Sequence, residues 1–515
     1  MGPMIGGYGP MANRSRRGAR VQSLPRGQGA GGMLSDRGNI ANHLSPSSDL
    51  FLPSNAAAGQ GPFMVEVVAF ALGAWLVADQ FQGQRLLLRI WVPNCTNDAT
   101  RPSNCQWLFD HSAIPRRQSS LNLFDFWMMG ILMTHDAAVL KAGEIAGGVL
   151  APAAAQNDKA GRFSTEAVAA LGEAGLLGLM LSADVGGLGL GPRTFAAVIA
   201  TLAEADASVA MVYLMHILGA ATISAARPRA TETITPTLKE ICAGRHLSTL
   251  AFSEAGSRSH FWAPTSRARR NGNDVRITAK KSWVTSAGHA HSYVVSSLAP
   301  EGTAPTESTL YLLLAATRGL SVAGPWDGLG LRANASAPLT LDECVVPPNL
   351  QLTDDGGGFP AMLNVVLPLF NLGTSAVALG VCRATVAGTV SHLKTARFEH
   401  LGRSLGESLP TLRAQLAGMQ IDTDGLAARI DDLIDHLEKP RETTMLRMLE
   451  SKAAAGDIAI SVTSSAMRIC GGSAFSKHLN VERLFRDAHA GAVMAPTGDV
   501  LREFIGKSLL GMPLF

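Results

Sequence analysis

The residues with the clearest potential for chemistry lie in one stretch, Leu247 to Gly288. Two extended apolar runs flank a loop of small residues, and the second run ends in Ser282-Trp283-Val284-Thr285-Ser286. Short hydroxyl side chains and glycines let backbone amides approach a polar ligand closely, and one large aromatic ring offers a stacking surface. The pattern predicts a ligand-binding loop, and an ordinary β-hairpin connection is the alternative.

Two other groups of residues could suggest a site, but their spacing argues against one. The six cysteines include no Cys-x-x-Cys pair and have no matching histidine spacing; they are Cys95, Cys105, Cys242, Cys344, Cys382 and Cys470. This argues against a structural zinc site and against a disulfide framework, so we predict no metal and a reducing, cytoplasmic location. The glycine-rich turn at residues 186–191 follows a helical pattern and lacks the spacing of a dinucleotide fingerprint, so we expect a helix-to-helix turn.

The spacing of apolar residues predicts the elements that must position the Leu247–Gly288 stretch, and this spacing changes twice along the chain. Before it, apolar residues recur at helical spacing in Ala137–Leu150, Thr194–Ala207 and Val209–Ala225, and Ser164 is placed to cap a further helix. Within and after it, short alternating runs predict an antiparallel barrel or sandwich: Val275–Thr278, Tyr293–Val295, Leu310–Leu314 and Leu339–Val346. Helical spacing then returns in Phe359–Leu393 (interrupted by Pro368), Leu409–Leu437, Thr443–Ile469 and Gly498–Leu510.

The predicted fold class is therefore α+β, with helices, then strands, then a four-helix bundle. The predicted boundaries are 1–128 for an unassigned low-complexity leader, 129–240 for an N-terminal helical domain, 241–352 for a middle β domain and 353–515 for the C-terminal bundle. The leader is rich in Gly, Pro, Ser and Arg up to Gly61, and Met129 and Met133 precede the first helix, so we interpret it as an upstream extension.

Composition narrows the class of partner. Of the 515 residues, 47% are hydrophobic and 17% are charged, which is typical of a globular chain, and the net charge of +3 is too small to indicate nucleic acid. The apolar segment Phe63–Ala78 carries Glu66 and is shorter than the ~20 residues that a membrane span needs, so we predict no membrane partner either.

Several motifs occur in the order typical of one known family. Ala251-Phe252-Ser253-Glu254-Ala255-Gly256-Ser257-Arg258-Ser259 followed by Lys281-Ser282-Trp283-Val284-Thr285 resembles the flavin-binding middle domain of the acyl-CoA dehydrogenases. Residues 171–190 and 204–216 resemble their N-terminal helical domain, and residues 328–347 resemble the end of their middle domain. Val481 to Ala488, which reads VERLFRDA, is similar to the hallmark of their last domain.

The resemblance implies an FAD between the middle domain and the bundle, shared between subunits of a homodimer or homotetramer. By motif position, Phe252, Ser253 and Ser259 would line the flavin and its diphosphate, and Trp283 and Thr285 would lie at the isoalloxazine ring. The remaining implied FAD contacts are Thr497 and Asp499 from the last helix and, towards an FAD in a neighbouring subunit, Arg468, Gly472 and Arg397 or Arg403. Arg468 stands where many relatives have glutamine, and the spacing at Arg397 departs from the family pattern.

The family's catalytic base is missing from its expected place. Dehydrogenation of an acyl thioester needs a base for the α-proton. The position implied for the usual glutamate is Ala495, and the other location known in the family falls near Phe370. Displaced bases could be Asp499 or Glu503, or a histidine, His216 or His489.

Four functions remain open at this point. The first is α,β-dehydrogenation of an acyl-CoA, with an electron-transfer protein as partner. The second is monooxygenation of another small molecule by reduced flavin and O₂, with a flavin reductase as partner and no need for an α-proton base. The third is a non-catalytic flavoprotein. The fourth ignores the resemblance and makes the chain a helical scaffold that binds a partner through its basic leader.

Overall fold

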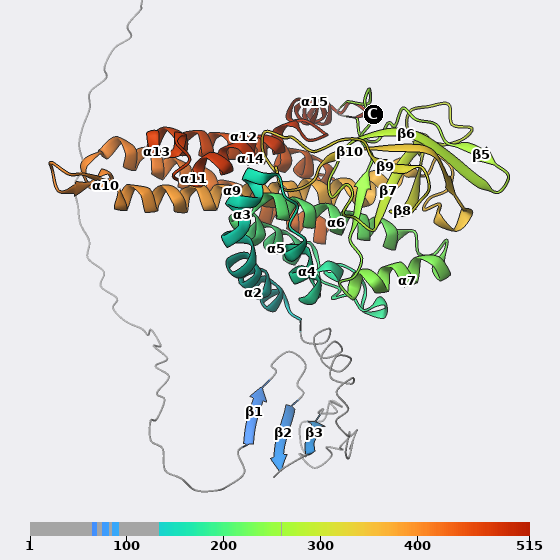
Figure 1. Cartoon of the computed structure of the whole chain (residues 1–515), viewed down its shortest axis with the longest axis horizontal. Helices are drawn as coiled ribbons and strands as arrows, with labels where there is room; N and C mark the ends of the chain where they lie inside the picture. The colour runs from blue at the N-terminus through green and yellow to red at the C-terminus, as the bar shows by residue number, and fades with distance from the viewer. Residues whose placement is uncertain (1–63, 69–74, 82–84, 92–132, 259, 515) are drawn as a thin grey trace, which may run out of the picture. The chain divides into compact units, whose positions relative to one another are not determined.

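The computed structural model describes residues 64–68, 75–81, 85–91, 133–258 and 260–514 (Figure 1). The chain divides into two compact units, residues 1–115 and residues 116–515. In the first unit, β1 (Met64–Val68), β2 (Trp75–Phe81) and β3 (Arg85–Trp91) form an antiparallel sheet in that order. The sequence analysis assigned no element there; β1 and the start of β2 fall inside the apolar Phe63–Ala78 segment. The rest of the predicted leader lies outside the described residues.

The second unit begins with the predicted helical domain. Its helices are α2 (His135–Ile145), α3 (Ala151–Ala160), α4 (Thr165–Glu173), α5 (Pro192–Ala205), α6 (Ala207–Ala225) and α7 (Thr231–Cys242). A π-helical turn, Ala146–Leu150, joins α2 to α3, so the first predicted helix runs ten residues further than expected. The predicted cap is confirmed, because the Ser164 side chain accepts a hydrogen bond from Ala167 N.

The middle domain consists of two small sheets. Its strands are β4 (Ser248–Ala251), β5 (Arg269–Asn271), β6 (Asp274–Val284), β7 (Ser292–Leu298), β8 (Ser308–Leu314), β9 (Leu320–Val322) and β10 (Ala337–Val346). One sheet has the order β5-β6-β10-β9 and the other β4-β7-β8. The predicted antiparallel pairing is confirmed for β5, β6, β8, β9 and β10, and β4 departs from it because it pairs with β7 in parallel. Val275, Ile277 and Leu341 are among the residues buried between the sheets.

The C-terminal domain is the predicted helical bundle. It comprises α8 (Gly358–Ala361), α9 (Leu367–Thr395), α10 (Leu405–Ser408), α11 (Pro410–Glu438), α12 (Thr444–Cys470), α13 (Gly472–Phe475), α14 (Val481–Val493) and α15 (Gly498–Leu509). A short hairpin of β11 (Arg397–Phe398) and β12 (Arg403–Ser404) follows α9. Pro368 does not break the first helix as predicted: it lies in the first turn of α9, after a π-helical segment, Met362–Val366.

The bundle also carries the N-terminal helices. Helix α12 packs against α9, α11, α14 and α15, while α5 and α6 pack on α9. In Figure 1 the two sheets of the middle domain lie at one end of the bundle, and α10 and α13 lie at the other end.

Within the described residues, three helical stretches are long and apolar enough to cross a membrane by length and composition alone: residues 135–160, 207–225 and 358–395. In the second and third, 83% of the apolar window is buried inside the protein, so packing in the core accounts for their hydropathy. In the first stretch, 33% of the window is buried.

The contact between α5 and α9 depends on a small residue. A Cβ atom added at Gly380 would lie 2.3 Å from Ala200 O and 2.6 Å from Ala203 Cβ, which is closer than van der Waals contact allows. Only glycine therefore permits the two helices to approach this closely.

We predict that Gly380→Ala lowers the free energy of unfolding by about 1–3 kcal/mol, because the overpacked helices must separate. Gly418→Ala is the matched control, since Gly418 lies in α11 and nothing comes within 4 Å of an added Cβ. The control should melt at or slightly above the wild-type temperature, since alanine favours helix by about 1 kcal/mol. Equal melting temperatures for the two variants would contradict the proposed close packing.

Candidate functional site

The site begins where the end of β4 runs beside the end of β6. Ser282 N donates a 2.8 Å hydrogen bond to Ser253 O, and Glu254 and Lys281 form an antiparallel β-bridge. The backbone thus brings two of the predicted motifs, residues 251–259 and residues 281–285, side by side. Ser259 lies outside the described residues.

A buried ion pair fixes this crossing. Lys281 Nζ lies 2.5 Å from Glu254 Oε1, and the two side chains are 0% and 2% exposed. Glu254 Oε2 also accepts hydrogen bonds from Thr265 N (2.8 Å) and Ser266 N (2.7 Å). Burial alone would raise the pKa of Glu254, but the Lys281 charge and the hydrogen bonds from Lys281 and from the Ser266 and Thr265 hydroxyls outweigh it and lower the pKa to about 2. The sequence analysis quoted both residues within its motifs but did not pair them.

Trp283 is exposed to solvent near the end of β6, the strand that the Glu254–Lys281 ion pair holds in place. Its side chain is 65% exposed and its φ is +53°, so it is not a core aromatic. Ser286 also has a positive φ, +62°, and its buried Oγ has no hydrogen-bond partner within the described part of the chain. Non-glycine residues in the left-handed region cost energy and concentrate at functional sites. A buried polar atom without a partner points the same way.

The neighbouring residues are packed more tightly. Thr285 is buried, and its hydroxyl shares a 3.0 Å hydrogen bond with Ser336. Phe252 is buried and begins a chain of ring contacts that leads to α15: Phe252–Phe261 at 6.4 Å, Phe261–Trp262 at 5.2 Å and Trp262–Phe504 at 5.7 Å between ring centroids. This chain anchors the middle domain to the helix that Thr497 and Asp499 begin.

The other predicted contacts lie elsewhere. Gly472 and Arg468 are exposed at the α12–α13 end of the bundle, and Arg397 is exposed in the β11 hairpin beside α10. Figure 1 places this end opposite the sheets of the middle domain. One copy of the chain therefore does not bring these three residues together with Trp283.

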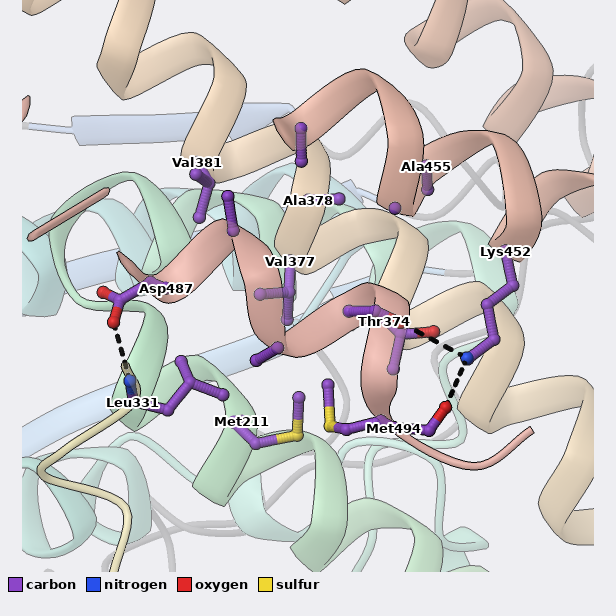
Figure 2. Close-up of a pocket in the computed structure, with 15 residues that line it drawn as sticks. Met211, Leu331, Thr374, Val377, Ala378, Val381, Lys452, Ala455, Asp487 and Met494 are labelled. Atoms are coloured by element: carbon purple, nitrogen blue, oxygen red, sulfur yellow. Dashed lines mark hydrogen bonds between the residues drawn. The ribbon is translucent and has the colours of Figure 1, made fainter. Parts of the chain in front are cut away.

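The two positions implied for a catalytic carboxylate meet at a lysine instead. Lys452 Nζ donates to Met494 O (3.0 Å) and Pro496 O (2.6 Å), the carbonyls on either side of Ala495, and it also lies 5.7 Å from the centroid of the Phe370 ring. Figure 2 shows this amine above the Met494 backbone. Burial lowers the pKa of Lys452 to about 7. Lys452 therefore holds the C-terminal end of α14. An amine, and not the expected carboxylate, lies at this place in the structure.

Figure 2 also shows Asp487 at the opposite end of the same small cavity, which has a volume of about 20 Å³, enough for about one water molecule. Asp487 accepts a 2.7 Å hydrogen bond from Leu331 N, and burial raises its pKa to about 7. It does not pair with its neighbour Arg486, which instead binds Asp158 at 2.6 Å and Glu482 at 2.8 Å. These contacts tie α14 to α3.

The structure places the four displaced-base candidates as follows. His216 is fully buried, and its two ring nitrogens lie 3.0 Å from Leu177 O and Ser248 N. His489 Nδ1 lies 2.7 Å from Phe485 O. Asp499 is fully exposed near Arg502, and Glu503 is 66% exposed near Lys507. Within the described part of the chain, no three His, Cys, Asp or Glu residues cluster so that they could hold a metal.

Three family models match the chain in the order of its domains. They are the acyl-CoA dehydrogenase N-terminal domain at residues 134–231, the middle domain at 249–344 and the C-terminal domain at 356–510.

Similar sequences carry the same family name. The chain is 26% identical over 385 residues to the mitochondrial short-chain specific acyl-CoA dehydrogenase of Rattus norvegicus, covering 73% of this chain and 90% of the relative. It is 24% identical to a probable acyl-CoA dehydrogenase of Mycobacterium leprae, covering 70% and 91%.

Solved structures share the fold. Butyryl-CoA dehydrogenase from Megasphaera elsdenii superposes with a TM-score of 0.68 at 22% identity, covering 73% of this chain and 99% of that chain. The prolyl acyl carrier protein oxidase AnaB superposes with a TM-score of 0.65 at 19% identity, covering 73% and 98%.

The ion pair gives a prediction about stability and pH. Glu254→Gln should destabilise the protein by about 3–5 kcal/mol, because Lys281 is left buried without a counter-charge. Since the folded-state pKa of Glu254 is depressed, its contribution is present above the unfolded pKa of about 4.5 and is lost as the pH falls towards 2.

Thermal melting across this pH range checks the prediction, with Glu343→Gln as the control because Glu343 is an exposed carboxylate of the same domain. The difference between wild type and Glu254→Gln should shrink on acidification. A constant difference, or an equal effect of the control, would contradict the assignment.

The lysine gives a second prediction. Lys452→Met should speed hydrogen exchange in residues 491–497, because the carbonyls of Gly491, Met494 and Pro496 lose their donor. Lys394→Met, at an exposed lysine of α9, is the control. Unchanged protection of residues 491–497 would show that Lys452 does not hold this segment.

Proposed function

Because the chain belongs to the acyl-CoA dehydrogenase family of flavin oxidoreductases, we propose that it binds FAD and oxidises an acyl-CoA thioester between its α and β carbons. The observation that carries the proposal is Trp283, held in a strained and exposed conformation at the family's flavin-binding motif.

The residues present fit a flavin. Trp283 offers an open aromatic face, the buried Ser286 hydroxyl lacks a partner, and the loop that follows β4 is built from small residues. When bound, FAD supplies the two-electron acceptor. In this proposal Trp283 packs on the ring and Thr285 and Ser286 orient it by hydrogen bonding, while Phe252 and Trp262 exclude water from one side. Thr497 and Asp499 border the same flavin from the start of α15.

The proposed site requires a second copy of the chain. Arg468, Gly472 and Arg397 lie at the end of the bundle far from Trp283, so they reach an FAD only if it belongs to a neighbouring subunit (Figure 1). We therefore propose a homodimer or homotetramer. We also propose a cytoplasmic location; the four described cysteines are free thiols, as suits a reducing compartment.

The α-proton is the difficult step for this reaction. Neither Ala495 nor Phe370 can accept a proton, and the nitrogens of His216 are occupied by the main chain. Asp499 and Glu503 are the candidates whose carboxylates are exposed. An electron-transfer protein would then reoxidise the flavin.

The missing carboxylate favours a second candidate of the same fold. A monooxygenase that uses reduced flavin and O₂ needs no base for an α-proton, so Ala495 and Phe370 would be unremarkable in it. Its partner would be a flavin reductase, and its substrate another small molecule.

Anaerobic titration with a panel of acyl-CoAs separates these candidates. Bleaching of the oxidised flavin absorbance by any thioester is the result that we expect. No bleaching, with O₂-dependent turnover of another substrate once a flavin reductase is supplied, would overturn dehydrogenation in favour of monooxygenation.

The cofactor assignment gives a separate prediction. Trp283→Ala should weaken FAD binding about tenfold, because the loss of an aromatic stacking partner costs on the order of 1 kcal/mol. The fold should survive, since Trp283 is 65% exposed. Leu314→Ala is the control, at a 42% exposed apolar residue of the same domain. Titration of the apoprotein with FAD measures both, and equal affinities would remove Trp283 from the site.

A further inference from the structure

A second cavity is lined by none of the residues assigned to the flavin. It has a volume of about 590 Å³, within the range of small-molecule sites. Helix α3 provides one wall, residues 328–332 provide another, and the segment from Lys477 to the first turns of α14 provides the third.

The lining is strongly basic. Five basic side chains and two acidic side chains face the cavity, which gives a net charge of +3: Lys159, Arg332, Lys477, Arg483 and Arg486, with Asp158 and Glu482. Both acidic side chains are already paired with Arg486. This arginine donates two hydrogen bonds of 2.6 and 2.9 Å to Asp158 and one of 2.8 Å to Glu482. Arg332 is likewise paired, with Asp327 at 3.1 Å. The pairs leave Lys159, Lys477 and Arg483 without an ion pair in the described part of the chain.

Three of these cations have donors without acceptors in the described part of the chain. Lys159 and Lys477 are exposed on opposite walls, and the side chain of neither makes a hydrogen bond or an ion pair there. Arg483 is 6% exposed and donates to Ala205 O at 3.1 Å, but its buried Nε has no hydrogen-bond partner. A buried guanidinium N–H without an acceptor is costly, and a bound anion would satisfy it.

We propose that this cavity is a binding site for a small phosphate-bearing anion. Two ammonium groups on opposite walls and a guanidinium between charged neighbours require a ligand with more than one negative charge, which phosphate groups supply and a single carboxylate does not. Leu329 and Ala155 add an apolar surface for a carbon framework. Lys452 of α12 holds the other end of α14, so the ligand would bind at the opposite end of this helix from the Ala495 segment.

Calorimetric titration of the full-length, FAD-saturated protein with inorganic pyrophosphate tests the proposal, because it requires no turnover. Saturable binding is expected, and Lys159→Ala/Lys477→Ala should weaken it at least tenfold. Both lysines are exposed, so the fold should be retained. The matched control is Lys394→Ala/Lys439→Ala, which removes two exposed lysines elsewhere.

Competition by ADP distinguishes two sources of the phosphate: tighter binding of ADP would identify a nucleotide, and equal or weaker binding an inorganic anion. The proposal is overturned by the absence of saturable pyrophosphate binding, or by an equal loss in both double variants. Either result would leave the flavin assignment untouched.

Discussion

The buried pair of Glu254 and Lys281 is the interaction on which the site depends. It joins the end of β4 to the end of β6 at a distance of 2.5 Å, with both charges out of solvent. Because breaking such a pair leaves an uncompensated charge in the interior, the strands cannot slide past each other at low cost. The rigid crossing then supports the positive φ at Trp283, a conformation that needs surrounding structure to maintain it.

A second set of polar contacts joins the three domains through α14. Arg486 binds Asp158 of α3, Asp487 accepts from Leu331 ahead of β10, and Lys452 of α12 holds the far end of α14. One helix thus sets the position of the N-terminal domain, the middle domain and the Ala495 segment together. The charged residues of the VERLFRDA motif therefore hold the domains together.

Much of the fold could be predicted because it follows local patterns. Apolar periodicity located α5, α6, α11, α12 and α15 to within a few residues, and the Ser164 cap follows from residue type alone. The parallel pairing of β4 with β7 could not be predicted from the sequence, because it joins strands about forty residues apart and leaves no periodic pattern of apolar residues. Helix α7 was missed because it contains Pro236 and several β-branched threonines.

The candidate site shows the same difference between residues in local sequence motifs and residues whose role depends on the fold. Trp283, Phe252 and Thr285 could be proposed from the sequence because they stand in contiguous motifs. Lys452 and Arg483 were not singled out, because nothing in the sequence distinguishes a lysine or arginine that folding will bury from one that stays in water.

The most direct test of this account is a cryo-electron-microscopy structure of the purified full-length protein with its bound cofactor. The account predicts FAD against Trp283 of one copy, with Arg468 and Gly472 of a second copy at its adenosine end. An FAD bound elsewhere, or a flavin-loaded monomer, would contradict it.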